Sequence, residues 1–296
     1  MTYMELQSCH LSQVKPNGKI HEIPGVSPPC RTPEQARQNG RMRILLVIGA
    51  DGAPFARTLG GLLGPDDELT VVAPTVRGHV SAGLHASPDL DGLLVSVDPT
   101  YAVADALESV GYTPTWQRAS DQAVAARLAR TELVLTGTTL TDATIAAGLR
   151  AALPYRLLPV CDDRAEFRVV VGSDEPRAIP VDEYLADPSS HEPTQLLLIA
   201  DQISVSAAVS TALLDCDALV LGPSSRTLAI DPVLRTPGFR DLVNDDLPVL
   251  VVDHADTAPA ELVRVAGLRE TDPGRPGLVP ADAGAVLEAA RKVVAA

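Results

Sequence analysis

The sequence has 296 residues, of which 46% are hydrophobic, and its 38 acidic against 24 basic side chains give a formal net charge of −14. This length suits one large or two small domains, and the apolar content is ample for a buried core. The negative charge repels phosphate backbones and anionic membranes, which argues against nucleic acid or membranes as partners. An anionic small molecule would bind only where backbone amides, helix N-termini or a few arginines act locally.

The N-terminal segment over residues 1–41 differs from the rest. It is rich in proline and glycine and has no apolar periodicity, which predicts disorder. Lys15 and Lys19 lie here, and only Lys292 follows. We interpret the segment as a mis-assigned extension before a natural start at Met42, or else as a genuine flexible tail.

The cellular compartment is predicted from what the chain lacks. The N-terminus has no secretory pattern, and no apolar run reaches membrane-spanning length. The four cysteines lie far apart without a CxxC pair, so we expect reduced thiols. A cytoplasmic protein is therefore expected.

Apolar runs and helical patterns alternate from Met42 onward. MRILLVI (42–48), ended by Gly49, predicts a strand buried on both faces of a parallel sheet. A helix over 55–63 and a strand over 68–73 complete a βαβ unit. The later elements are helices over 102–110, 121–135 and 142–152, strands over 156–160, 167–171 and 195–200, a helix over 204–214, strands over 218–222 and 247–253, and a helix over 281–295.

This order predicts the fold class α/β, with a Rossmann-like, mostly parallel sheet flanked by helices. We expect one domain over residues 42–296, with an inserted helical block at about 100–152. Ligands of such sheets bind beyond the carboxyl ends of the strands. Three loops are therefore candidates for a site.

The first candidate loop is GADGAP, residues 49–54. Small residues between a strand and a helix N-terminus can turn backbone amides toward a phosphate. Many such turns are only tight connections, so the two interpretations stay open. The candidate binding residues are Gly49, Gly52 and Ala53.

The second candidate loop, residues 73–92, is long and has little regular pattern, which is typical of functional loops. Arg77 could clamp an anion, and Asp89 and Asp91 could act in catalysis or hold a hard divalent cation. Alternatively, Asp89 could cap a helix that begins near Leu90. The two histidines of the loop are more simply explained as surface residues.

The third candidate loop is GPSSRT (222–227), directly after a predicted strand. Its amides, hydroxyls and guanidinium can bind an anion, although a serine N-cap of the next helix explains it equally well. The candidate binding residues are Gly222, Pro223, Ser224, Ser225 and Arg226.

Taken together, these segments resemble the CofD family of transferases, which build a deazaflavin coenzyme. VIGADGAP (47–54) is similar to the family's AGGxGGAR turn, and PDLD (88–91) is intact. RLLPVCDDR (156–164) is similar to RLLPxTDDR, CDALVLGPSSRTLAIDPVL (216–234) to ADxIVxGPSNPxxSIxPIL, and PGFR (237–240) to a PGIR-like segment. The resemblance covers most of the chain from Met42 to Asp253.

The resemblance implies an enzyme that moves a phospholactyl or phosphoenolpyruvyl group from a GDP-activated donor to the ribityl hydroxyl of a deazaflavin. GMP is released, and magnesium assists. By the same resemblance Asp162, Asp163 and Arg164 join the glycine loops on the nucleotide side. The assembly stays open, with a homodimer as one option. The gluconeogenesis-factor group shares the GP-x-S loop and is an alternative, although Arg164 favours the transferases.

This chain departs from the family where an NxGDD stretch supplies metal-binding carboxylates, since Arg77 and Gly78 replace both aspartates. In one hypothesis, Arg77 and Arg226 supply fixed cations, and metal dependence is weaker. In another, the protein binds a nucleotide or phosphorylated metabolite without transfer. An NAD oxidoreductase would need an acidic residue at the end of the second strand, where Ala73 and Pro74 stand.

Overall fold

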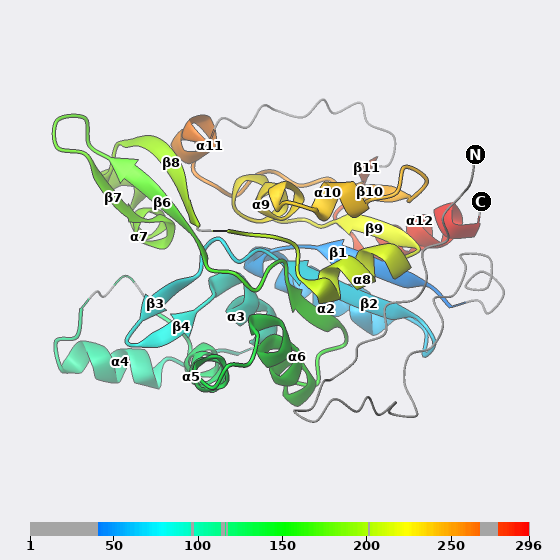
Figure 1. Ribbon diagram of the computed structural model, residues 1–296, viewed down its shortest axis with the longest axis horizontal. Helices are drawn as coiled ribbons and strands as arrows, with labels where there is room; N and C mark the ends of the chain where they lie inside the picture. The colour runs from blue at the N-terminus through cyan, green and yellow to red at the C-terminus, as the bar shows by residue number, and fades with distance from the viewer. Residues whose placement is uncertain are drawn as a thin grey trace, which may run out of the picture. The chain divides into compact units, whose positions relative to one another are not determined.

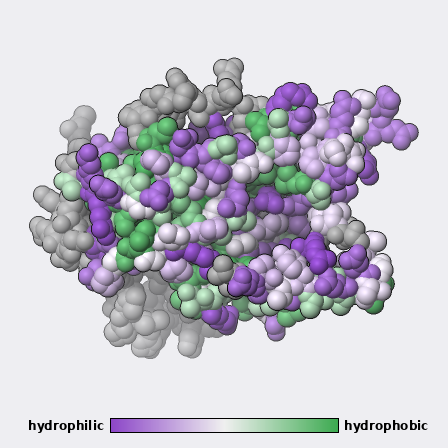
Figure 2. All heavy atoms as spheres, turned by 180° about the vertical axis from the view of Figure 1, so that it is seen from behind, coloured by the Kyte–Doolittle hydropathy of each residue, from purple (hydrophilic) through white to green (hydrophobic). Residues whose placement is uncertain are grey.

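The computed structural model describes residues 41–95, 98–113, 116, 118–200, 202–266 and 278–295. The predicted extension over 1–41 lies outside the described residues, apart from Arg41. Residues Arg41–Ala296 form one compact unit. None of the described helices is both long and apolar enough to cross a membrane. Figure 2 shows hydrophilic residues over much of the face seen from behind, with apolar residues in small groups between them.

A six-stranded sheet in the order β11-β10-β9-β1-β2-β5 forms the centre of this unit, and its neighbouring strands are parallel (Figure 1). The strands are β1 (Arg43–Val47), β2 (Glu68–Ala73), β5 (Arg156–Pro159), β9 (Ala218–Leu221), β10 (Val249–Val252) and β11 (Leu278–Val279). The first strand is central and the strand order reverses between β1 and β9, as in Rossmann folds. The predicted fold class is confirmed.

Alternate residues of β1 serve two cores. Ile44 and Leu46 pack in the core on one face, and Leu45 and Val47 in the core on the other. Because both faces are covered, the strand is apolar at every position after Arg43. The helices of the first face are α2 (Ala53–Leu62), α3 (Pro88–Leu94) and α12 (Ala283–Ala295), and those of the second are α8 (Ala207–Asp215), α9 (Asp231–Arg235) and α10 (Phe239–Leu242).

A second, antiparallel sheet in the order β7-β6-β8 departs from the simple alternation that the sequence suggested. It consists of β6 (Ala165–Val171), β7 (Arg177–Pro180) and β8 (Pro193–Ala200), and carries α7 (Val181–Ala186), the 3-10 turn η2 (Pro188–Ser190) and α11 (Ala260–Val265). Two of these strands were predicted, but as members of the main sheet. Short apolar runs specify a strand without specifying its partner, because pairing depends on residues distant in sequence.

The long loop after β2 is more regular than expected. It contains a hairpin of β3 (His79–Ser81) and β4 (Leu84–Ala86) and then the start of α3. Ala82 and Gly83 turn the hairpin with φ values of 50° and 75°. Strands of three residues are too short for alternation to reveal them.

Three helices lie between α3 and β5: α4 (Ala102–Ser109), α5 (Asp121–Leu135) and α6 (Leu140–Arg150). Ser120 caps α5 and Thr139 caps α6, since each side chain accepts a hydrogen bond from an amide in the first turn. In Figure 1 these helices lie with the β3–β4 hairpin on the same side of the main sheet. They flank the loop that carries Arg77, Asp89 and Asp91.

Candidate functional site

The loops after β1 and β9 lie against each other. β1 pairs directly with β9, and the Gly49 amide donates a hydrogen bond to Ser224 Oγ at 3.0 Å. Asp51 joins the loops further, because it accepts hydrogen bonds from the Ser224 hydroxyl and from the Ser225 amide, the latter at 2.9 Å. Two of the three candidate loops therefore meet at the point where the strand order reverses.

The glycines of this junction are required by close packing. A Cβ on Gly49 would lie 2.8 Å from Ala229 Cβ and 2.9 Å from Asp89 Oδ1. A Cβ on Gly52 would lie 2.2 Å from Ile48 Cδ1. Any larger residue at either position would push the loops apart.

A cavity of about 180 Å³ opens at this junction, and we call it the switch-point cavity. The loops after β1, β2, β9 and β10 all contribute to its wall, together with α3 and α7. This is the crevice where open α/β sheets bind ligands. The lining residues are Asp51, Arg77, Asp89, Leu185, Ser225, Leu228, Ala229 and Thr257.

Asp89 lines this cavity and has one buried carboxylate oxygen without a partner among the described residues. The side chain is 2% exposed, and its Oδ1 accepts hydrogen bonds from the Ala50 amide at 3.0 Å and from Arg77 Nη1 at 3.4 Å. Its Oδ2 has no hydrogen-bond partner among the described residues. Burial raises the pKa of Asp89 to about 6, although Arg77 and the Ala50 amide oppose the rise. Such an orphaned buried oxygen is often satisfied by a bound ion or water.

Arg77 is a fixed cation whose charge is already compensated. Its Nε donates to Asp182 Oδ1 at 3.1 Å, and its Nη2 pairs with the same oxygen. Burial opposes the charge, but the carboxylates of Asp89 and Asp182 outweigh it and raise the pKa of Arg77. With Asp51 also in the wall, one guanidinium faces three carboxylates. The charge of Arg77 therefore does not make the cavity positive.

Asp91, two residues after Asp89, is outside the set that lines the switch-point cavity. Its Oδ1 accepts a hydrogen bond from Arg130 at 2.6 Å, and its Oδ2 accepts from Arg127 at 2.7 Å and from the Ser87 amide at 3.2 Å. Both oxygens are therefore used to tie α3 to α5. The structure does not bring the two predicted carboxylates together.

Four amides of the first loop donate hydrogen bonds within the protein. Those of Gly49 and Ala50 donate to side chains, and those of Gly52 and Ala53 donate to the carbonyls of Gly49 and Ala50. In the third loop, the Gly222 amide donates to the Val47 carbonyl, and Pro223 has no N–H. Phosphate binding by these residues stays a prediction.

The remaining candidates lie outside the switch-point cavity. Asp162 accepts a hydrogen bond from the Thr141 amide at 2.7 Å, and Asp163 accepts one from the Ser204 amide at 3.4 Å. They follow β5, which is separated from β1 by β2. Arg164 is largely exposed and lies 3.8 Å from Glu166, and Arg226 donates to Asp231 at 3.3 Å.

Sequence reasoning missed Asp51 and Asp256, which hold the loops in place. Asp256 accepts hydrogen bonds from the Ser225 hydroxyl at 2.6 Å and from the Thr227 amide and hydroxyl at 3.0 and 2.8 Å. Although burial opposes it, these hydrogen bonds lower the pKa of Asp256. The residue follows the predicted strand over 247–253, so a search beyond every strand end would have found it.

The carboxylates fit magnesium only as part of a ligand complex. Among the described residues, no group of three or more His, Cys, Asp or Glu side chains could hold a metal ion. Asp51 accepts three hydrogen bonds. Its Oδ1 accepts from the Ser224 hydroxyl, and its Oδ2 accepts from the Ser225 amide and from the Thr257 hydroxyl at 3.1 Å. Asp89 Oδ2 is the remaining carboxylate oxygen of the cavity wall. Magnesium commonly uses one or two carboxylates together with substrate phosphates and water, and that donor set matches this wall.

Comparisons with known proteins agree with the motifs. The family model described as 2-phospho-L-lactate transferase CofD matches residues 46–266. The phosphoenolpyruvate transferase of Kitasatospora aureofaciens is 28% identical over 219 residues, covering 68% of each chain. That of Streptomyces griseus is 30% identical over 220 residues, covering 68% of this chain and 69% of the relative. A crystal structure of a Bacillus halodurans protein of the upf0052 family has a TM-score of 0.52 at 13% identity, covering 76% of this chain and 75% of that one. This last likeness concerns the fold alone.

Proposed function

Because this chain belongs to the CofD family of 2-phospho-L-lactate transferases, we propose that it transfers a phosphate-bearing group at the switch-point cavity. The donor is a phospholactyl or phosphoenolpyruvyl group whose phosphate is joined to the phosphate of GMP, so that the two form a diphosphate. The acceptor is the ribityl hydroxyl of a deazaflavin. The observation that carries the proposal is the convergence of four strand-end loops on one cavity at the point of strand-order reversal.

The charge of the cavity decides the form in which the donor enters. Three carboxylates surround one guanidinium, so a diphosphate on its own would be repelled. We therefore place the donor as its magnesium complex, with Asp89 Oδ2 as the protein's metal ligand. Bound magnesium would offset the negative charge of the phosphates. We therefore expect that binding of the donor depends strongly on magnesium, and not weakly as in the hypothesis of fixed cations.

The residues of the chain then position the reaction. Arg77, held by Asp182, lines the cavity and would contact the phosphate oxygens of the donor. Asp51 keeps the two glycine loops together. The acceptor oxygen bonds to phosphorus as the bond from phosphorus to the bridging oxygen breaks. That electron pair leaves with GMP, and the hydroxyl proton passes to solvent. Phosphoryl transfer of this kind depends mainly on positioning and charge stabilisation.

A protein that binds the nucleotide without transferring a group is the second candidate function. Arg77 and Gly78 support it, because they stand where the family resemblance implies metal-binding carboxylates. Binding and turnover must therefore be measured separately.

The test is isothermal titration of GDP into the full chain, with magnesium and then with EDTA, and with NAD as a control ligand. We expect GDP binding that weakens at least about tenfold in EDTA, which is 1.4 kcal/mol, and no binding of NAD. Absence of GDP binding under both conditions would refute the proposal. GDP binding without GMP release in the presence of donor and deazaflavin would select the second candidate.

A further inference from the structure

An ion pair between Arg77 and Asp182 connects the switch-point cavity to the antiparallel sheet. Arg77 Nε donates to Asp182 Oδ1 at 3.1 Å, and Nη2 pairs with the same oxygen. The side chain of Asp182 is 15% exposed. The described residues that line the cavity include Arg77 but not Asp182. Asp182 therefore acts on the cavity through the guanidinium that it holds.

The fold fixes the place of Asp182. The loop after β2 is bonded to β6, because the Phe167 amide donates to the Val76 carbonyl at 2.6 Å. Strand β6 pairs with β7, and α7 follows β7 directly. Two other residues of α7, Val181 and Tyr184, are buried in the core of the antiparallel sheet. Asp182 is thus carried to the loop after β2 by a packed helix.

The contacts of Arg77 leave little of its charge for a ligand. A guanidinium binds a phosphate best through two parallel N–H groups, and Asp182 already accepts from Nε and Nη2. Nη1 donates to Asp89 Oδ1 at 3.4 Å. Asp51 adds a third carboxylate in the wall. Three ionised carboxylates against one guanidinium leave a net charge of −2 at this position.

Among the three carboxylates, Asp182 is the one that serves mainly to balance Arg77. Asp51 holds two loops together, and Asp89 faces the cavity. The other oxygen of Asp182 lies 4.0 Å from His79 Nδ1. Burial is the main cause that raises the pKa of Asp89, and the charges of Asp182 and Asp51 add to it. The charge of Asp182 is therefore felt at the carboxylate that faces a ligand.

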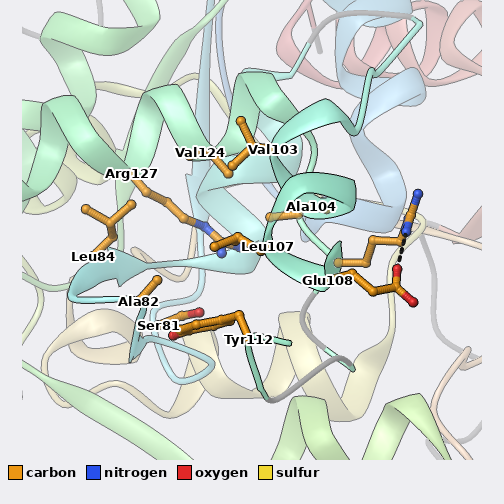
Figure 3. A pocket seen from close by; sticks show the side chains of 12 residues that line it. Ser81, Ala82, Leu84, Val103, Ala104, Leu107, Glu108, Tyr112, Val124 and Arg127 are labelled. Carbon is orange, nitrogen blue, oxygen red and sulfur yellow. Dashed lines mark ion pairs between the residues drawn. The ribbon is translucent and has the colours of Figure 1, made fainter. Parts of the chain in front are cut away.

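A larger cavity of about 210 Å³ between the β3–β4 hairpin, α4 and α5 is a poorer place for a diphosphate. Figure 3 shows the aliphatic side chains of Leu84 and Leu107 in its wall. Both guanidiniums of this wall are already paired: Arg127 with Asp91 at 2.7 Å, and Arg118 with two carboxylates of α4. A diphosphate is therefore expected at the switch-point cavity.

We infer that Asp182 determines which form of the diphosphate the switch-point cavity accepts. By balancing the charge of Arg77, it disfavours the bare diphosphate and leaves the magnesium complex as the form that binds. It is a specificity-determining residue and not a catalytic one, because it acts through Arg77. Without its charge, the guanidinium would attract phosphate oxygens directly. This inference rests on the proposed function and names the residue behind its metal requirement.

The test uses Asp182→Asn, which keeps an oxygen that can accept from Arg77 but removes the charge. Glu183→Gln removes the same charge at the next position of α7 and is the matched control. GDP is titrated by calorimetry into the full chain at pH 8, with magnesium and with EDTA. In EDTA we expect Asp182→Asn to bind GDP about tenfold more tightly than wild type, which is 1.4 kcal/mol. With magnesium the two affinities should be similar, and Glu183→Gln should equal wild type under both conditions.

Two results would overturn the inference. Unchanged affinity of Asp182→Asn in EDTA would show that the charge of Asp182 does not exclude the bare diphosphate. Weaker binding under both conditions would show that Asp182 only positions Arg77. Thermal melting shows whether each variant is folded. If Asp182→Asn is not, Asp182→Ala takes its place with the same expected result, because alanine is a better helix former.

Pyrophosphate, which carries two linked phosphates without guanosine, separates this inference from the proposed function. In EDTA, Asp182→Asn should bind pyrophosphate more tightly than wild type does. That result supports the inference even if GDP does not bind, which would refute the proposed function alone. Equal pyrophosphate affinities of the two proteins, with GDP binding retained, would overturn the inference alone. Absence of binding of either compound to either protein would overturn both.

Discussion

Asp89→Asn should stabilise the metal-free protein at pH 8 while abolishing the effect of magnesium on GDP binding. Burial raises the pKa of Asp89 from 3.8 to about 6, so the folded protein holds this proton more tightly than the unfolded chain does. The contribution of protonated Asp89 to the stability of the folded protein is therefore complete below about pH 4, and it is lost as the pH rises through about 6. At about 1.4 kcal/mol per pKa unit, ionised Asp89 costs the folded state about 3 kcal/mol at pH 8.

Asparagine resembles the protonated carboxyl and should recover most of that free energy. A gain of about 2–3 kcal/mol corresponds to roughly 5–10 °C in the melting temperature of a unit this size. The assay is thermal and urea unfolding of both proteins in EDTA at pH 8 and pH 4.5. The difference should shrink to about 1 kcal/mol or less at pH 4.5. Equal destabilisation by Asp89→Asn at both pH values would refute the electrostatic reasoning.

Three further substitutions test the remaining contacts. Asp91→Asn should lower the free energy of unfolding by roughly 3–5 kcal/mol, because it leaves two arginines without a buried counter-charge; a stabilising effect in the same urea scans would contradict this. Asp51→Ala should lower the free energy of unfolding by roughly 2–4 kcal/mol and weaken GDP binding, measured by calorimetry, because three donors lose their acceptor. Asp66→Ala, at an exposed position, should change neither quantity. Arg77→Gln should weaken GDP binding about tenfold or more, because a charge-assisted contact is lost, and unchanged calorimetric affinity would remove Arg77 from the site.

The strand ends, and with them the crevice, could be predicted from the sequence. ILLVI (44–48) and ALVL (218–221) are uninterrupted apolar runs, because β1 and β9 are covered on both faces. The sequence alone therefore predicts that the turns after these runs lie at the ligand end of a parallel sheet. The antiparallel sheet of β6 to β8 was not placed, since strand propensity carries no information about distant partners.

The different surroundings of Asp89 and Asp91 could not be predicted. Both belong to the first turn of α3, where two residues differ by about 200° around the helix axis. One carboxylate therefore faces the loop after β1, and the other faces the arginines of α5. Helix geometry permits this division, but only the neighbouring elements decide which aspartate is left with a free oxygen.

The sequence by itself determined five of the six strands of the main sheet, where each of these five ends, and which family the chain resembles, because burial on two faces and short motifs are local properties. Only the tertiary structure decided which polar groups remain available. Asp51 and Ser225 are hydrogen-bonded across 174 positions of chain, and Arg77 and Asp182 across 105. The charge and the hydrogen bonds of the site therefore depend on residues that are far apart in the sequence, and a local sequence pattern carries no information about them.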